Sequence, residues 1–337
     1  MGISLKVNMP LELRQAVRKR PGMYFGDIES GGANTVVYEI VANAVDIFLA
    51  GLAKKINIEV NNNNIIISDD GPGFPFFKAS PQDTSINLVE YYLTNFHNSP
   101  TADNHAPHIH ILGRGLGLAV LNAASKKLAI ESSDGEKLWT QNFGEGMVLS
   151  PATHESGNFP TGSKVSITLD PMVFDNHGPN SFELRKIFFE VVHLYPGLSI
   201  EFEKECFYSN NGLVDLGYIL LKKSASYMGM PKMFRFHYQK KGIEFQVAAL
   251  GDSKEGTEFR SWVNGCASVE NGSHAKGLSS ALRLNKWKPE IALIHVIMHD
   301  PKFAGPCRDA LQMPEVLKVI EEKLTPEIKA FLNAQNA

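Results

Sequence analysis

The stretch from Val36 to Ala50 constrains the fold most, because it is the clearest helix in the chain. Its apolar residues recur at helical spacing, which predicts that one stripe faces a core. The other side carries Glu39, Asn43 and Asp46, four and three residues apart, so these polar side chains stack along one helix face. A solvated helix face usually carries Lys and Glu pairs, and this face does not.

A carboxylate and an amide oxygen one helical turn apart suit a site that combines a general base with a cation ligand. One group takes a proton from water, and the other holds a hard cation such as magnesium. On the helix alone, a half-buried helix with a few hydrogen-bonded polar groups is the simpler interpretation. The choice therefore depends on the rest of the chain.

Length and composition indicate an ordinary globular protein. A chain of 337 residues suits two domains, and a linker-like composition from Pro171 to Pro179 places the expected boundary between residues 1–172 and 173–337. The formal charge of −3 gives no global attraction to DNA or to an anionic membrane, so any nucleic-acid contact would be local. Paired lysines at 222–223 and 240–241 leave DNA contact open, although such pairs are usually only solvated.

The cysteines and the N-terminus indicate the compartment. Cys206, Cys266 and Cys307 lie far apart and form no CxxC, which favours reduced structural thiols over a zinc site or a disulfide framework. The sequence shows neither a signal peptide nor a run of about twenty apolar residues. We therefore expect a soluble, cytoplasmic protein.

A hairpin leads into the first candidate ligand loop. Strands are expected at 56–60 and 65–68, joined by the four asparagines 61–64. The second strand runs directly into Asp69-Asp70-Gly71-Pro72-Gly73. An acidic pair and two glycines after a strand suit the close approach of backbone to a ligand.

A second glycine-rich segment, Gly113-Arg114-Gly115-Leu116-Gly117, opens the apolar helix expected at 119–124. Such a turn can present backbone N–H groups to phosphates, but alone it is a weak signal. The polar segment 95–112 before it contains His105, His108 and His110. We interpret that segment as a surface lid rather than a metal site, because no matching Cys or carboxylate accompanies the histidines.

The remaining pattern alternates helices and strands. A helix over 10–18 is followed by turn signals at 20–22 and at 31–32. Strands are expected at 128–132, 138–143, 164–169, 198–203, 234–238, 245–250 and 291–299, and helices at 182–194, 276–284 and 314–334, the last interrupted near Pro326.

Taken together and in order, Glu39 with Asn43, Asp69 with Gly71 and Gly73, and the glycines from 113 to 117 resemble the three ATP-binding boxes of the GHKL superfamily, which contains gyrase B, the Hsp90 chaperones, the histidine kinases and MutL. The motifs RKRPGMYFGD at 18–27, DDGPGFP at 69–75 and NGCASVENGSHAKGL at 264–278 look like the gyrase B and topoisomerase IV subunit ParE branch.

The resemblance implies an α+β fold. The first domain would be the GHKL (Bergerat) ATP-binding α/β sandwich with a mixed sheet, and the second a transducer domain of the ribosomal S5 domain 2-like type. A histidine-kinase role is disfavoured, because the second half offers no helical hairpin with a phosphoacceptor.

The resemblance also assigns roles. Glu39 matches the general base, Asn43 the residue that holds Mg2+ against the triphosphate, and Asp69 the acceptor for the adenine amino group, supported by Ser163. Arg308 matches a transducer lysine that reaches the terminal phosphate. The other expected nucleotide-binding residues are Asp46, Gly71, Gly73, Gly113, Arg114, Gly115, Leu116 and Gly117.

Departures from the family pattern predict slow hydrolysis. Ile47 and Pro72 stand where the family has an acid and an arginine in an ion pair, and both partners are lost together. Thr35 replaces a histidine that orients the catalytic glutamate, while Pro306 replaces the glutamine before Arg308. The segment before the glycine box is also shorter than usual, which bears on lid closure.

The function implied is that of an ATPase of the type II topoisomerase ATPase-subunit type, which dimerises on binding ATP, with residues 1–9 as a short arm toward the partner subunit. The alternative is a non-hydrolysing nucleotide-binding regulator that pairs with a gyrase or topoisomerase IV subunit. The DNA-cleavage domains are missing from the sequence, so we expect no topoisomerase activity from it alone. An excised fragment and a free-standing paralogue both remain open, and the departures favour the paralogue.

Overall fold

The protein divides into two compact units. The computed structural model describes residues 10–76, 78–80, 84–95, 115–221, 231–240, 242–305 and 308–335. The first unit comprises Met1–Phe189 and Gly197–Tyr208, and the second Glu190–Pro196 and Ser209–Ala337. The units do not coincide with the boundary expected after residue 172, because the chain returns to the first unit after helix α7 (Ser181–Leu194). No helix in the described ranges is long and apolar enough to cross a membrane.

Several sequence features fall outside the described ranges. They are the expected arm at 1–9, the three histidines of the expected lid, the lysines at 222, 223 and 241, and Cys307. The predictions made for them stay predictions.

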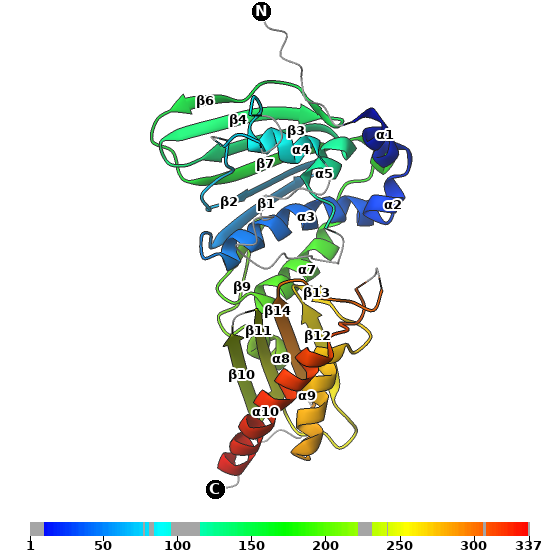
Figure 1. The fold of residues 1–337 in the computed structure, drawn as a ribbon, viewed down its shortest axis with the longest axis vertical. Coiled ribbons are helices and arrows are strands. Elements are labelled where there is room, and N and C mark those ends of the chain that lie inside the picture. The colour runs from blue at the N-terminus through cyan, green and yellow to red at the C-terminus, as the bar shows by residue number, and fades with distance from the viewer. Residues whose placement is uncertain are drawn as a thin grey trace, which may run out of the picture. The chain divides into compact units, whose positions relative to one another are not determined.

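A mixed nine-stranded sheet forms the first unit (Figure 1). Its order is β5-β4-β3-β7-β2-β1-β8-β9, with β6 paired to β4. The β1–β8 pair is parallel and the other pairs are antiparallel. The strands are β1 Lys55–Asn61, β2 Asn64–Asp69, β3 Ser125–Ser133, β4 Lys137–Gly144, β5 Met147–Val148, β6 Thr153–Ser156, β7 Gly162–Leu169, β8 Ser199–Phe202 and β9 Glu205–Tyr208.

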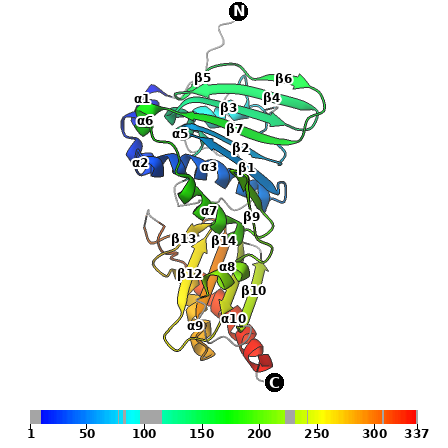
Figure 2. The same cartoon turned by 180° about the vertical axis from the view of Figure 1, so that it is seen from behind.

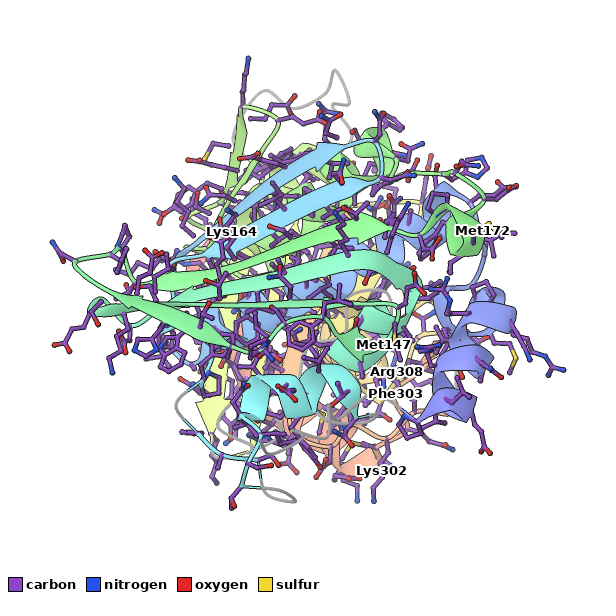
Figure 3. All side chains as sticks on the ribbon, turned by 90° about the horizontal axis from the view of Figure 1, so that it is seen from above. Met147, Lys164, Met172, Lys302, Phe303 and Arg308 are labelled. Atoms are coloured by element: carbon purple, nitrogen blue, oxygen red, sulfur yellow. The ribbon has the colours of Figure 1, made fainter. Side chains whose placement is uncertain are left out.

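Helices cover one face of this sheet. The long helix α3 (Ser30–Leu49) runs across it, as both views of the ribbon show (Figures 1 and 2). Ile65 and Ile67 of β2 face the helices and are buried. Lys164 of β7, labelled in Figure 3, lies on the opposite face, where its ammonium is 3.0 Å from the Glu131 carboxylate. The other helices are α1 Leu11–Lys19, α2 Pro21–Phe25, α4 Leu88–Thr94, α5 Leu118–Ala124 and α6 Pro171–Phe174.

The prediction of two turns before the central helix is wrong. Pro21 begins helix α2, since proline at the first helical position needs no N–H partner. Gly31 and Gly32 lie inside the first turn of α3, which begins six residues earlier than expected. The Asp27 carboxylate accepts the Gly32 N–H at 2.7 Å, and a Cβ on Gly32 would lie 2.3 Å from the Asp27 carbonyl oxygen. This close contact requires glycine at 32, and the Asp27 carboxylate satisfies an N–H of the first helical turn.

The expected hairpin is confirmed. Strands β1 and β2 pair from Ile56 opposite Asp69 to Asn61 opposite Asn64. The turn places Asn62 at φ 52°, a left-handed conformation that asparagine tolerates. Asp70 is structural, because its carboxylate accepts the backbone N–H groups of Lys54 and Lys55 at 2.7 and 2.9 Å. The hairpin thus presents Asp69 at the end of β2.

The second unit contains a five-stranded sheet of order β10-β11-β14-β12-β13. Helices α9 (Ser273–Leu284) and α10 (Pro314–Gln335) pack on it through buried residues such as Leu278, Ile320 and Leu324. Helix α10 continues through Pro326, so the expected interruption is wrong. The remaining elements are α8 Leu213–Leu220, β10 Met233–Lys240, β11 Ile243–Leu250, β12 Glu258–Val263, β13 Cys266–Ala267 and β14 Ile291–Met298.

Candidate functional site

A cavity opens between helix α3 and the segment that follows β2. Its walls are mostly apolar, with an amide, a carboxylate and a hydroxyl among them. The lining residues are Ile40, Asn43, Ala44, Ile47, Ile67, Asp69, Pro72, Gly73, Phe74, Pro75, Leu118, Ser163 and Val165. Apolar walls with a few placed polar groups are typical of a small-molecule site.

Asp69 is a half-buried polar group of this cavity. One of its carboxylate oxygens accepts the Gly71 N–H at 2.9 Å, and the other accepts the Ser163 hydroxyl. Burial raises the pKa of Asp69 above its ordinary value, and the hydrogen bonds from Ser163 and Gly71 oppose that rise. The carboxylate is therefore held rigidly in an apolar place, with acceptor capacity left over for a ligand N–H.

The turn after Asp69 is pressed against the neighbouring strands. Gly73 has φ 80°, and a Cβ there would lie 2.4 Å from Ser132 Oγ and 3.1 Å from the Gly162 carbonyl oxygen. The Phe74 N–H donates to Ser132 Oγ at 2.6 Å. Glycine at 73 is thus required both by conformation and by space.

Glu39 contacts the glycine-rich turn. Its side chain is buried, and one carboxylate oxygen accepts the backbone N–H groups of Leu116 at 2.8 Å and Gly117 at 3.4 Å. Gly115 and Gly117 have positive φ angles of 65° and 78°, which glycine adopts without strain. The structure therefore brings the predicted base and part of the predicted phosphate turn together. Gly113 and Arg114 lie outside the described residues.

Asn43, one turn after Glu39, lines the same cavity. No group of three or more His, Cys, Asp or Glu able to hold a metal occurs in the described part of the chain. A cation here would rest on the Asn43 amide and on ligand and water oxygens, which suits magnesium. Asp46 is fully buried and is not among the residues that line the cavity, so its predicted contact with a nucleotide finds no support.

The departures from the family pattern have structural counterparts. The Thr35 hydroxyl lies 3.2 Å from the carbonyl oxygens of both Phe25 and Gly31, so it is engaged within the helix region rather than with Glu39. Ile47 and Pro72 both line the cavity, which makes the position of the absent ion pair apolar.

Arg308 belongs to the second unit. Its backbone has φ 61°, and its guanidinium carbon lies 5.9 Å from the centroid of the Phe303 ring (both labelled in Figure 3). Burial raises the pKa of the nearby Cys266 thiol, and the Arg308 charge opposes that rise. The contact of Arg308 with a phosphate stays a prediction, and Pro306 lies outside the described residues.

Sequence reasoning missed the apolar walls and Ser132. Ile67 and Val165 lie two residues from Asp69 and Ser163 on their strands, and strand alternation puts them on the same face. That signal was present in the sequence. Ser132 could be placed only by the pairing register between β3 and β7, which no local pattern reveals.

The fold and this arrangement agree with the resemblance to the GHKL class. A mixed sheet is covered by a helix that carries Glu39 and Asn43, Asp69 lies at a strand end, and a glycine turn precedes the next helix. No known protein-family profile matches the chain. The chain is 28% identical to the B-subunit of DNA gyrase from Campylobacter jejuni and 27% identical to the B-subunit of DNA topoisomerase 4 from Rickettsia typhi, over 95% of its own length in both cases. It spans 46% and 53% of those proteins, about half their length.

Solved structures show the same fold. The 43K ATPase domain of Thermus thermophilus gyrase B, in complex with an aminocoumarin, matches with a TM-score of 0.78 at 21% identity, covering 97% of this chain and 91% of that one. The topoisomerase IV ATP binding domain of Francisella tularensis, in complex with a small-molecule inhibitor, matches with a TM-score of 0.77 at 22% identity, covering 95% and 91%. The chain is a homologue of the ATPase region shared by the B-subunits of gyrase and topoisomerase IV.

Proposed function

We propose that this protein binds ATP in the α3 cavity and hydrolyses it slowly with magnesium. The observation that carries the proposal is the placement of two polar groups in one apolar cavity, with a third group one helical turn away on α3. Asp69 and Asn43 line the cavity, and Glu39, which precedes Asn43 by one turn, accepts a backbone N–H group of the glycine turn.

The base end of the cavity suits adenine. Ile67, Val165 and Pro75 offer apolar surface to a flat ring, and the Asp69 carboxylate offers an acceptor to an exocyclic amino group. A buried acceptor discriminates strongly, because a base without the matching donor would leave it unpaired. Guanine presents a carbonyl oxygen where adenine has its amino group, so this end favours adenine.

The phosphate end depends on backbone and on Glu39. Leu116 and Gly117 direct N–H groups toward the Glu39 carboxylate, and such N–H groups are also suitable partners for phosphate oxygens. Glu39 would act as the general base that takes a proton from the attacking water, a role that needs a carboxylate within reach of that water. Asn43 would hold magnesium, whose charge stabilises the phosphate oxygens.

The proposal extends to assembly. An ATP-dependent homodimer with the second unit as transducer and Arg308 contributing charge at the terminal phosphate agrees with the homology to gyrase B. Guanidinium keeps the charge of the family's lysine but not its shape.

One observation favours a second candidate, a nucleotide-binding regulator that does not hydrolyse ATP and pairs with a gyrase or topoisomerase IV subunit. The Thr35 hydroxyl is engaged with the carbonyl oxygens of Phe25 and Gly31, at the position where the family pattern has a histidine that orients the glutamate. Intact Glu39 still favours hydrolysis.

The test is the mass by light scattering, with and without magnesium and a non-hydrolysable ATP analogue, followed by phosphate release from ATP on the same sample. A shift from monomer to dimer with slow phosphate release supports the ATPase. Binding with neither dimerisation nor release supports the regulator. Failure to bind ATP at all contradicts both candidates.

A further inference from the structure

We propose that Ser132 is a positioning residue that sets the affinity of the cavity for the base of the nucleotide. The proposal deepens the proposed function and rests on it. Ser132 lies at the end of β3, is buried, and is not one of the residues that line the cavity. It acts on the cavity through the turn that forms one of its walls.

The hydroxyl of Ser132 binds both polar backbone groups of Phe74. It accepts the Phe74 N–H at 2.6 Å and donates to the Phe74 carbonyl oxygen at 3.3 Å. Phe74 and its neighbours Pro72, Gly73 and Pro75 all line the cavity. One side chain from another strand therefore attaches this wall to β3.

Ser132 and Ser163 together hold both ends of the wall segment. Asp69, Ser163 and Ser132 stand directly opposite one another on β2, β7 and β3. Ser163 donates to the Asp69 carboxylate where the segment begins, and Ser132 binds Phe74 five residues later. One row of the sheet thus sets both the base acceptor and the apolar wall beside it.

The turn at Gly73 lies so close to β3 that the attachment through Ser132 leaves little room for the turn to move. A Cβ at Gly73 would lie 2.4 Å from Ser132 Oγ and 3.0 Å from the Ser133 carbonyl oxygen. The turn therefore already sits at van der Waals distance from β3. At Ile47 and Pro72 the cavity carries apolar side chains, so no ion pair between these two positions anchors the turn. The attachment through Ser132 is the polar one that the structure shows from β3 to Phe74.

The test compares Ser132→Ala with Ser209→Ala. Both serines are 3% exposed and accept one backbone N–H, but Ser209 accepts that of Gly212 in the second unit, outside the α3 cavity. Calorimetric titration of the full chain uses three probes: ADP, adenosine and inorganic tripolyphosphate. Thermal unfolding of each variant shows whether it remains folded.

We expect Ser132→Ala to weaken binding of ADP and of adenosine by the same factor, about 10-fold, because a buried N–H without an acceptor lets the turn move. Binding of tripolyphosphate should be unchanged, and Ser209→Ala should leave all three probes unchanged. Equal loss for all three probes in Ser132→Ala, or no loss for adenosine, overturns the proposal while the proposed function stands. If the unaltered protein binds neither ADP nor adenosine, the proposed function fails and this inference fails with it.

Hydrogen exchange supplies a measurement that needs no variant. The Phe74 amide should be protected from exchange in the unaltered protein, since its N–H is bonded to a buried hydroxyl. Exchange of this amide at the rate of an open loop contradicts the attachment on which the proposal rests.

Discussion

The two ends of the proposed nucleotide site are built in different ways. The proposed base end is made by side chains on three paired strands, where Asp69, Ser163 and Ser132 share one row of the sheet. The proposed phosphate end is made by a helix side chain and a turn, where Glu39 accepts N–H groups from Leu116 and Gly117. Sheet pairing fixes positions through many hydrogen bonds, whereas a turn is held by few.

This difference in construction suits the two ends to different tasks, the selection of the base at one end and hydrolysis at the other. Groups on a rigid sheet are suited to selecting a base, because their geometry is set before a ligand arrives. A turn at a helix start can rearrange its N–H groups around phosphates, which is the property that a hydrolytic site requires. Substitutions at the base end should therefore change affinity, and substitutions at the phosphate end should change turnover.

The largest effect is expected for Glu39→Gln. The amide oxygen can still accept the Leu116 N–H, so ATP affinity should change by less than about threefold. Turnover should fall by about 10² to 10⁴-fold, because the general base is lost. The rate of phosphate release under saturating ATP measures the turnover. Glu90→Gln is the control, since Glu90 accepts a hydrogen bond from Gln141 at 2.7 Å and does not line the cavity. Equal turnover in both variants would remove the distinction between the two ends.

Asp69→Asn should show the next largest effect, on affinity. It removes a charged acceptor, so adenosine and ATP should bind about 10 to 100-fold more weakly. Burial raises the pKa of Asp69, which means that its ionised form at neutral pH costs stability, so the asparagine variant should unfold at the same or a higher temperature.

Asp70→Asn provides the matched control for that substitution. Asp70 caps the backbone N–H groups of Lys54 and Lys55 and is absent from the cavity lining. Its amide oxygen can still accept, so nucleotide affinity should stay within about twofold. An equal loss of affinity in the Asp70 variant would mean that the effect arises from the hairpin as a whole.

Asn43→Ala tests the boundary between the two ends. Asn43 lines the cavity one turn after Glu39. Loss of its amide should weaken ATP binding by about tenfold with magnesium present and by much less with EDTA. Isothermal titration in both buffers measures the difference. An equal loss in EDTA would assign Asn43 to the base end.

The smallest effect is expected from pH. The ionised Asp69 carboxylate is the stronger acceptor for an amino group, and burial raises the pKa of this carboxyl. Adenosine affinity should therefore fall as pH is lowered, beginning above the range of an ordinary aspartate, by at most about tenfold per pH unit below that pKa. Titrations of adenosine and of tripolyphosphate at neutral pH and at successively lower pH compare the ends. The Asp69→Asn variant should show no such dependence, and a parallel loss for tripolyphosphate would contradict the assignment.

Local sequence patterns were sufficient for the main elements. Helical spacing predicted α3 and its polar face, and the run of asparagines predicted the hairpin that carries Asp69. The α+β fold with a mixed sheet followed from the resemblance and is confirmed. These features depend on contacts between residues close in sequence, or on motifs whose order is preserved.

Contacts with other parts of the chain determined the conformation of the segments for which local sequence signals gave a wrong prediction. Pro21 is typical of a turn but begins a helix, and Gly31 and Gly32 are typical of a turn but lie inside α3 because Asp27 accepts the Gly32 N–H. Pro326 is accommodated within α10. Each residue type permits two conformations, and packing selects one of them.

The sequence by itself indicated the groups proposed to do chemistry, since Glu39, Asn43, Asp69 and the glycines from 115 to 117 match, in order and separation, the boxes of the family that the chain resembles. Only the tertiary structure decided that Asp46 is buried away from the cavity lining and that Ser132 anchors its wall. The physical reason is the register between strands. It brings Ser132 opposite Ser163 and within hydrogen-bonding distance of Phe74, 58 residues away in sequence.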